Sequence, residues 1–234
     1  AQHECEADFA QVARLVDEFA DLPMLLIPGN HDVDGRQDGT IPLTIGRRKL
    51  AYTRKVDTLD LPGARVIVAD TTIPGRGRGT LDRVANPILE QAAGSDRPVF
   101  LGMHHQLQKK RLPRYWPAGI GAPRSLAFLD ELNRLAQPVT VSSGHTHRNR
   151  SRRHGEVLIT EVGSTKDWPG VWAGYAVHEG GIRQVIRRVA DPYAIDWTEY
   201  SRQAVLGLWG HWSPGPLAGR CVSHPWAARS STMV

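Results

Sequence analysis

Pro98–His105 (PVFLGMHH) is the stretch that decides the fold, because a short apolar run ends directly in two histidines. An apolar run of this length without alternation is typical of a strand that is buried on both faces of a parallel sheet. Pro138–His147 (PVTVSSGHTH) has the same form, with His145 and His147 just beyond the run. Because ligands bind at the carboxyl edge of open α/β sheets, we expect these histidines to converge on one site there.

Two further apolar runs extend the pattern toward the N-terminus. Ala64–Ala69 (ARVIVA) precedes Asp70, and Met24–Ile27 precedes the polar stretch Gly29–Asp32 (GNHD). The helical spacing of apolar residues predicts helices before and between these runs, at residues 6–20, 81–93 and 125–136. Strands that alternate with helices predict an α/β fold with a mostly parallel sheet.

The sequence changes in texture after the last of these runs. Three short segments, at residues 157–160, 172–177 and 182–188, predict successive antiparallel strands, the last two joined by a tight turn. The tail from Asp191 is rich in Trp, Gly and Pro and has no clear period. We therefore expect one domain over residues 1–190 and a C-terminal extension over residues 191–234.

Composition sets broad limits on the class of protein. The 234 residues are 41% hydrophobic and 23% charged, which is ordinary for a globular domain and excludes wholesale disorder. No apolar run approaches the length of a membrane-spanning helix, and 2 cysteines are too few for a disulfide scaffold. The formal net charge of +5 suits an anionic ligand but is too small to indicate nucleic acid by itself.

The residues that follow the runs have the chemistry of a hydrolytic metal site. Neutral imidazole is the commonest protein ligand for metal ions, and the amide oxygen of Asn30 is a harder ligand that suits Mn, Fe, Zn or Mg. His31, next to Asp32, is a candidate for a histidine that is held by a carboxylate and protonates a leaving oxygen. Each motif alone has an ordinary explanation as a turn or a packed strand. Their joint occurrence, in order and each after an apolar run, favours a functional site.

Gly29–Asp32, His104–His105 and Gly144–His147, in this order, resemble the motifs of the calcineurin-like metallophosphoesterases, and in particular of the bacterial cyclic-AMP-phosphodiesterase-like members. The resemblance extends over residues 6–190, most of the chain. It implies a four-layer α/β/β/α sandwich that holds two metal ions, Mn, Fe or Zn, at the strand ends.

The resemblance also implies a set of metal ligands. Asn30, His104 and His145 would bind the second metal ion, and His147 would bind the first. His105 would lie behind the ligands or face the substrate, and the choice between His104 and His105 as the ligand stays open.

Three further residues receive roles near the substrate. His31 would be the catalytic histidine beside the scissile phosphate, with Asp32 orienting it. Arg148, the first residue of a basic stretch after the histidine loop, is a candidate for substrate binding. For that basic stretch, a solvated turn and strand is the alternative interpretation.

Two motifs of the resembled family are missing. Its members have an Asp-x-His at the first strand and a Gly-Asp at the second, which supply ligands to the first metal ion and the carboxylate that bridges both ions. Before Gly29 this chain has only Asp8, Asp17 and Asp21, all within or at the end of the predicted helix. Together with Ala1 in place of an initiator Met, this predicts a chain that begins after the second motif and lacks the first strands, with a degenerate pseudoenzyme as the alternative. Such a chain is expected to bind at most one metal ion well.

The sequence thus predicts a metal-dependent phosphoester hydrolase, with hydrolysis of a small phosphodiester as the reaction. Cyclic nucleotides, glycerophosphodiesters and phosphomonoesters all stay open as substrates. The alternatives are a metal-dependent nuclease, in which basic loops hold the nucleic-acid backbone, and a catalytically impaired module that binds a phosphorylated ligand. We expect no membrane partner and a cytoplasmic location; the sequence does not indicate an oligomeric state.

Overall fold

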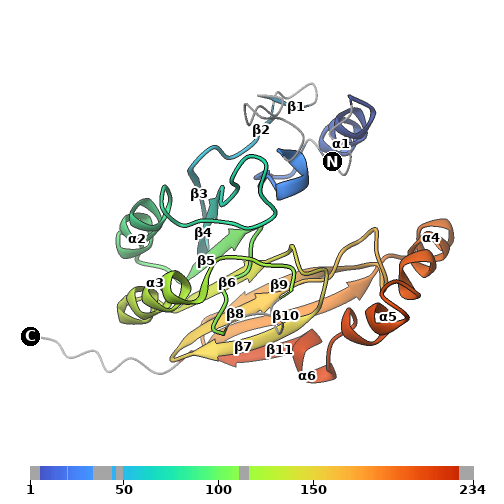
Figure 1. Ribbon diagram of the computed structural model, residues 1–234. Coiled ribbons are helices and arrows are strands. Elements are labelled where there is room, and N and C mark those ends of the chain that lie inside the picture. The colour runs from blue at the N-terminus through green and yellow to red at the C-terminus, as the bar shows by residue number, and fades with distance from the viewer. Residues whose placement is uncertain (1–5, 20, 34–43, 46–49, 111–115, 227–234) are drawn as a thin grey trace, which may run out of the picture.

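The computed structural model describes residues 6–19, 21–33, 44–45, 50–110 and 116–226 (Figure 1). None of the helices in these residues is both long and apolar enough to cross a lipid bilayer. The helices are α1 (Glu6–Glu18), η1 (Asn30–Asp32, a 3₁₀ helix), α2 (Ala85–Ala93), α3 (Ala122–Arg134), α4 (Pro192–Arg202), α5 (Leu208–Trp212) and α6 (Leu217–Arg220). The strands are β1 (Thr44–Ile45), β2 (Leu50–Ala51), β3 (Val56–Leu61), β4 (Ala64–Ala69), β5 (Val99–Met103), β6 (Val139–Ser143), β7 (Arg150–His154), β8 (Val157–Glu161), β9 (Val171–His178), β10 (Gly181–Arg188) and β11 (Cys221–Pro225).

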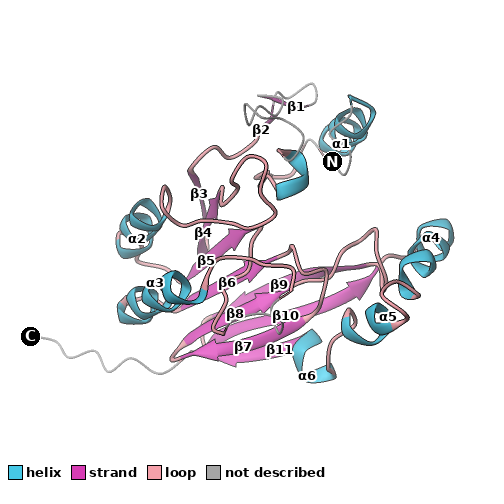
Figure 2. Cartoon of the chain, viewed as in Figure 1, coloured by secondary structure: helices cyan, strands magenta, loops and turns pink. Residues whose placement is uncertain are grey.

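A six-stranded mixed sheet, in the order β3-β4-β5-β6-β8-β7, forms the centre of the fold (Figure 2). Strands β4, β5, β6 and β8 are parallel, and β3 and β7 pair antiparallel at the two edges. Helices α2 and α3 bury apolar side chains against one face, so that Ile88 and Leu129 share a core with Ile67, Leu101 and Val141 of the strands. The predicted α/β class is confirmed in this form.

A three-stranded antiparallel sheet, β11-β10-β9, lies against the opposite face of the large sheet. Tyr175 of β9 makes the link, with its hydroxyl 2.9 Å from Ser142 Oγ and 2.8 Å from Thr160 Oγ1. Its ring packs edge-on against Phe100 at 4.6 Å between centroids. Because side chains alternate along a strand, Phe100, Ser142 and Thr160 point away from α2 and α3. The described residues thus show a helix–sheet–sheet order, and the four-layer sandwich stays a prediction.

The prediction of a strand at Met24–Ile27 is wrong. Among the described residues this run makes only an isolated bridge, from Leu26 to Tyr52. Leu26 packs instead on a small buried cluster that α1 forms through Phe9 and Val16. An apolar run that packs against a helix needs no neighbouring strand. Its periodicity does not distinguish such a segment from a buried strand.

The C-terminal part of the chain corrects one further prediction and shows the structure of the tail, which the sequence left open. Strand β8 is not the first of an antiparallel series, because it pairs parallel with β6 and antiparallel with β7. The tail from Asp191 has regular structure: α4, α5 and α6 precede β11, which pairs with β10. The side chain of Asp191 caps α4 by accepting a hydrogen bond from the backbone N–H of Ala194 at 2.7 Å. The domain boundary at residue 190 stays a prediction.

Candidate metal centre

The carboxyl ends of two neighbouring parallel strands bring the histidine motifs together. His104 follows β5, and the loop Gly144–His147 follows β6. The N–H of Gly144 donates to the carbonyl oxygen of His104 at 3.1 Å, which ties the two loops directly. Asn30 lies on η1, and the described run before it forms only the isolated bridge of Leu26. The convergence predicted for this edge of the sheet is therefore seen for Asn30, His104 and His145.

Three potential ligand atoms of these residues lie within hydrogen-bond distance of one another. Asn30 Oδ1 is 2.9 Å from His104 Nε2 and 3.1 Å from His145 Nδ1. His104 Nε2 is 3.2 Å from His145 Nδ1. Two ligands at right angles, each about 2.1 Å from one ion, lie about 3.0 Å apart, so the spacing of the three atoms matches a shared cation.

The protonation of His145 strengthens the fit to a cation. His145 Nε2 lies 3.1 Å from the carbonyl oxygen of Ala118, which can only accept, so Nε2 carries the ring hydrogen. Burial lowers the pKa of His145 to about 4, so the ring is neutral and Nδ1 presents a lone pair. That lone pair and the oxygen of Asn30 face each other, and a hydrogen on His104 Nε2 would satisfy at most one of them. A metal ion at this point satisfies all three atoms.

Gly29 allows the His104 ring to approach η1. A Cβ atom on Gly29 would lie 2.8 Å from His104 Cε1, closer than real Cβ contacts, so a larger residue here would displace the His104 ring. The backbone N–H of Gly29 donates to Asp32 Oδ2 at 2.7 Å, which holds the turn in shape. Asp32 therefore has an observed role in the turn, and its orientation of His31 stays a prediction.

His105 lies beside these ligands and is fully buried. Its Nδ1 is 2.9 Å from Thr71 Oγ1, a contact across β4 and β5 that the sequence did not suggest. A side chain without exposed surface does not face a substrate, so the structure agrees with the other expected place, behind or among the ligands. The ligand atoms of His104, His105 and His145 all lie within 4.8 Å of one another, so His105 competes with Asn30 as the third ligand.

His147 is oriented by a carboxylate that the sequence analysis missed. His147 Nδ1 lies 2.5 Å from Asp167 Oδ2, in the loop between β8 and β9. Although burial alone would raise it, the hydrogen bond from His147 holds the pKa of Asp167 below its ordinary value. A ring that donates through Nδ1 to a carboxylate keeps Nε2 available as a lone pair, the usual arrangement of a metal-binding histidine. The twenty-residue separation and the two intervening strands left no local signal for this pair.

The loop that carries both histidines is strained. His145 and His147 have φ angles of 61° and 49°, in the left-handed region that residues other than glycine seldom adopt. Each such residue costs about 1–2 kcal/mol and persists only where the surroundings hold it, which is typical of functional sites.

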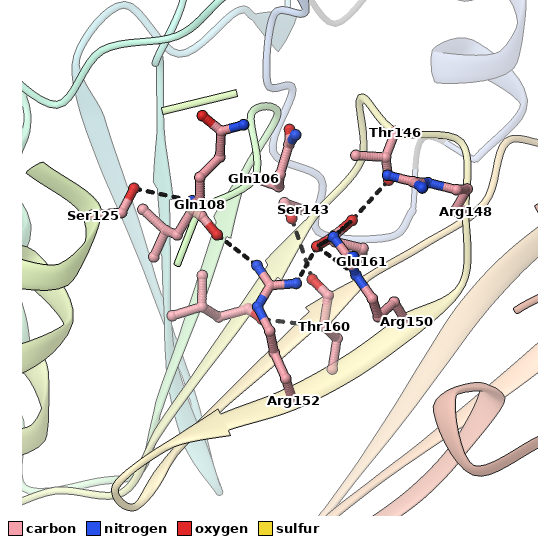
Figure 3. A network of polar contacts seen from close by, with 12 residues as sticks. Gln106, Gln108, Ser125, Ser143, Thr146, Arg148, Arg150, Arg152, Thr160 and Glu161 are labelled. Atoms are coloured by element: carbon pink, nitrogen blue, oxygen red, sulfur yellow. Dashed lines mark hydrogen bonds and ion pairs between the residues drawn. The ribbon is translucent and has the colours of Figure 1, made fainter. Parts of the chain in front are cut away.

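A buried carboxylate holds this loop in place (Figure 3). Thr146, between the two histidines, donates to Glu161 Oε2 at 3.0 Å. Glu161 is fully buried, and Arg150 Nη2 donates to its Oε1 at 2.8 Å while Arg152 Nη1 donates to the same oxygen. Although burial alone would raise it, the two guanidinium groups hold the pKa of Glu161 below its ordinary value. The carboxylate therefore stays charged and anchors the loop through Thr146.

The basic stretch after the loop turns inward. Arg150 and Arg152 lie on strand β7, as the alternative interpretation predicts, but their side chains bind Glu161 and do not form a surface for a ligand. Arg148 Nη2 donates to the carbonyl oxygen of Trp116 at 2.9 Å, and Arg148 is not among the residues that line the adjacent cavity. The structure therefore does not support the predicted contact of Arg148 with a substrate.

A cavity of about 950 Å³ opens beside the cluster. His31 is exposed and lines this cavity, together with Asn30, His104, His145 and His147. All six residues predicted as ligands or as catalytic thus lie at one site, because Asp32 lines the cavity as well.

Burial of the histidine cluster predicts a marked pH dependence of stability in the metal-free protein. Burial, and to a smaller extent the neighbouring His145 ring once it is protonated, lowers the pKa of His105 to about 3. An unfolded histidine takes up its proton near pH 6.5, so between about pH 6.5 and 4 the unfolded chain holds more protons and the free energy of unfolding falls as the pH is lowered. Each histidine that stays neutral contributes a slope of up to about 1.4 kcal/mol per pH unit. The His105→Asn variant should lose that much slope in urea unfolding with a chelator present.

The exposed His178, at the end of β9, supplies the matched control. The His178→Asn variant should keep the slope of the parent protein. Because the slope is compared, and not the stability itself, a packing defect at residue 105 does not imitate the effect. An unchanged slope in His105→Asn would show that His105 becomes protonated in the folded protein.

Comparison with known proteins finds a weak similarity to a phosphodiesterase. No protein-family model matches the chain. A probable cyclic nucleotide phosphodiesterase of Psychrobacter arcticus is 22% identical over 152 residues, which are 62% of this chain and 53% of that protein. The chain thus spans about half the length of this curated relative. A crystal structure of a hypothetical protein from Thermus thermophilus covers 77% of the chain and 87% of its own length, with 12% identity and a TM-score of 0.33, too low to support a shared fold. A weak relative named as a phosphodiesterase and a histidine cluster that could bind metal together fit a phosphoesterase.

Proposed function

We propose that this chain is the metal-binding part of a phosphoester hydrolase and that phosphodiesters are its substrates. The observation that carries the proposal is the convergence of Asn30 Oδ1, His104 Nε2 and His145 Nδ1 within 3.2 Å of one another, at the edge of a cavity. The mixed oxygen and nitrogen ligand set, without thiolates, suits a catalytic ion more than a structural one. The name of the Psychrobacter arcticus protein supports the same reaction class.

The residues divide the work of such a reaction as follows. When bound, a divalent ion neutralises the phosphoryl oxygens and activates water for attack on phosphorus. Asn30, His104 and His145 would hold the ion, and His147, oriented by Asp167, offers a further ligand for a second one. His31 would donate a proton to the oxygen that leaves as its bond to phosphorus breaks, because its exposed ring lines the same cavity.

The finer assignments belong to the same proposal. We assign the chain to the calcineurin-like metallophosphoesterases on its three ordered motifs, with two metal ions and a four-layer sandwich in the whole protein. Small phosphorylated molecules are the proposed substrates. The nuclease alternative receives no support from Arg150 and Arg152, because both are bound to Glu161. Steep salt dependence of binding would favour a nucleic-acid ligand after all.

Replacement of His31 by alanine tests the proposal. The His31→Ala protein should hydrolyse phosphodiesters more slowly by a factor of about 100 or greater, because a positioned general acid contributes at least about that factor. The loss should be larger for an ester with a ribose hydroxyl as the leaving group than for bis-p-nitrophenyl phosphate, whose leaving group needs no proton. Rates are measured with saturating Mn²⁺.

The affinity for Mn²⁺ is the control in this experiment. It should be the same in His31→Ala and in the parent protein, because His31 is proposed to serve the leaving group and not the ion. An equal loss for both leaving groups would remove the role of His31 as an acid. Absence of hydrolysis by the parent protein and by a longer form of it would overturn the proposed function.

A further inference from the structure

One wall of the cavity is built by the C-terminal helices. Ser201 lies on α4, Ala204 and Val205 follow it, and Trp209 lies on α5; all four line the cavity. Ser201 Oγ accepts a hydrogen bond from the backbone N–H of Trp168 at 2.7 Å, which fixes the end of α4. The wall therefore has a fixed position in the fold, although nothing in the proposed hydrolysis requires it.

Two tryptophans form the aromatic part of this wall. Trp209 is 9% exposed, and its ring stands edge-to-face with the ring of Trp116 at 6.4 Å between centroids. The ring of Trp209 also contacts His147 edge-to-face at 6.3 Å, which joins the aromatic wall to the histidine loop. Trp116 keeps 50% of its surface exposed and lines the cavity. Arg148 holds the backbone of Trp116 through the hydrogen bond to its carbonyl oxygen. An indole that is held in place and half exposed offers a rigid face for stacking.

Two cationic side chains line the same cavity as the tryptophans and the histidines. Arg78 extends from the loop after β4, and Lys166 stands next to Asp167, with its Nζ 3.9 Å from an oxygen of that carboxylate. Both cationic side chains are exposed to the cavity side of the molecule. The cavity thus combines positive charge, imidazoles and an aromatic face.

We propose that Trp116 and Trp209 form a subsite for a planar heteroaromatic ring, so that the ligand of this cavity is a nucleoside phosphate or its ester. The inference rests on the proposed function, because it takes the phosphoryl group to lie at the histidines. The ring stacks on the exposed face of Trp116, while Trp209 supports Trp116 from the side. Base stacking on an aromatic side chain changes affinity about 5- to 150-fold.

Calorimetric titration with two ligands tests the subsite, with Mn²⁺ present throughout. Adenosine monophosphate carries the ring, and ribose 5-phosphate is the same phosphate ester without it. The parent protein should bind adenosine monophosphate about 10-fold more tightly or better. Trp116→Ala should remove this preference and leave the affinity for ribose 5-phosphate unchanged, and Trp116→Phe should restore much of it. Trp116 is half exposed, so the folded state should tolerate both changes.

Trp197→Ala is the matched control, because Trp197 lies on α4, is 56% exposed and does not line the cavity. It should bind both ligands as the parent protein does. Equal affinity of the parent for the two ligands, absence of binding of either, or an equal effect of Trp197→Ala would each overturn the subsite. Loss of the preference in Trp116→Ala without any phosphoester hydrolysis would support the subsite and reject the proposed function. Hydrolysis without a preference would reject the subsite alone.

Discussion

Calorimetric titration of the His104→Ala and His145→Ala proteins with Mn²⁺ or Zn²⁺ should show the affinity for the ion reduced about 100-fold or more. Each substitution removes one of the atoms that converge with Asn30 Oδ1 within 3.2 Å. With these atoms as ligands, the parent protein should bind one ion tightly. The difference from the parent should shrink as the pH is lowered toward that of histidine protonation, because protons compete with the ion for the imidazole that the parent has and the variant lacks.

The same titration decides between Asn30 and His105 as the third ligand. If Asn30 coordinates the ion, Asn30→Ala should weaken binding far more than His105→Ala, and the reverse order would assign the ligand to His105. His178→Ala removes an exposed histidine at the end of β9 and should leave binding unchanged. A parent-like affinity in both His104→Ala and His145→Ala would show that the ion, if any, binds elsewhere.

The convergence of these ligands could be predicted from the sequence because its causes are local. The apolar runs at residues 98–103 and 138–141 predict two strands, and the order of strands and helices makes the strands parallel. Parallel strands bring their carboxyl ends to one edge, so His104 and His145 meet without any knowledge of long-range contacts. Asn30 reached the site through the motif, although the strand expected before it is only a bridge.

The partners of the histidines could not be predicted, because they depend on contacts between distant segments. Asp167 meets His147 only after two strands have returned the chain to the same edge. Trp209 lies in a tail without a hydrophobic period, so its place beside His147 had no signal in the sequence. The basic stretch after residue 147 forms strand β7, as one of its two interpretations held, but a single buried acid at the end of an apolar strand binds two of its arginines, which neither interpretation included.

Replacement of that buried acid, Glu161, should have a second large effect, on the free energy of unfolding. Glu161 is fully buried, and Arg150 and Arg152 direct their guanidinium groups at it. Removal of one partner from a buried ion pair leaves uncompensated charge and costs about 3–5 kcal/mol. Glu161→Gln keeps the shape of the side chain, so the free energy of unfolding in urea should fall by about 3 kcal/mol at neutral pH, through loss of charge and not of volume. The affinity of the same variant for Mn²⁺ should fall by a factor of about 10 or greater, because the hydrogen bond that anchors the loop at Thr146 is weakened.

Glu131→Gln makes the same chemical change in an exposed pair and serves as the control. Glu131 accepts a hydrogen bond from Arg134 at 2.6 Å on α3, where both side chains are more than half exposed. An exposed ion pair contributes only about 0–1 kcal/mol, so this variant should unfold at nearly the urea concentration of the parent.

Thr146→Val separates the two effects of Glu161, because it removes the hydrogen bond to the loop and leaves the ion pair intact. It should weaken metal binding with a stability loss of only about 1–3 kcal/mol, the desolvation penalty of one unmade bond. If Glu161→Gln and Glu131→Gln proved equally stable, the buried carboxylate would not hold the loop.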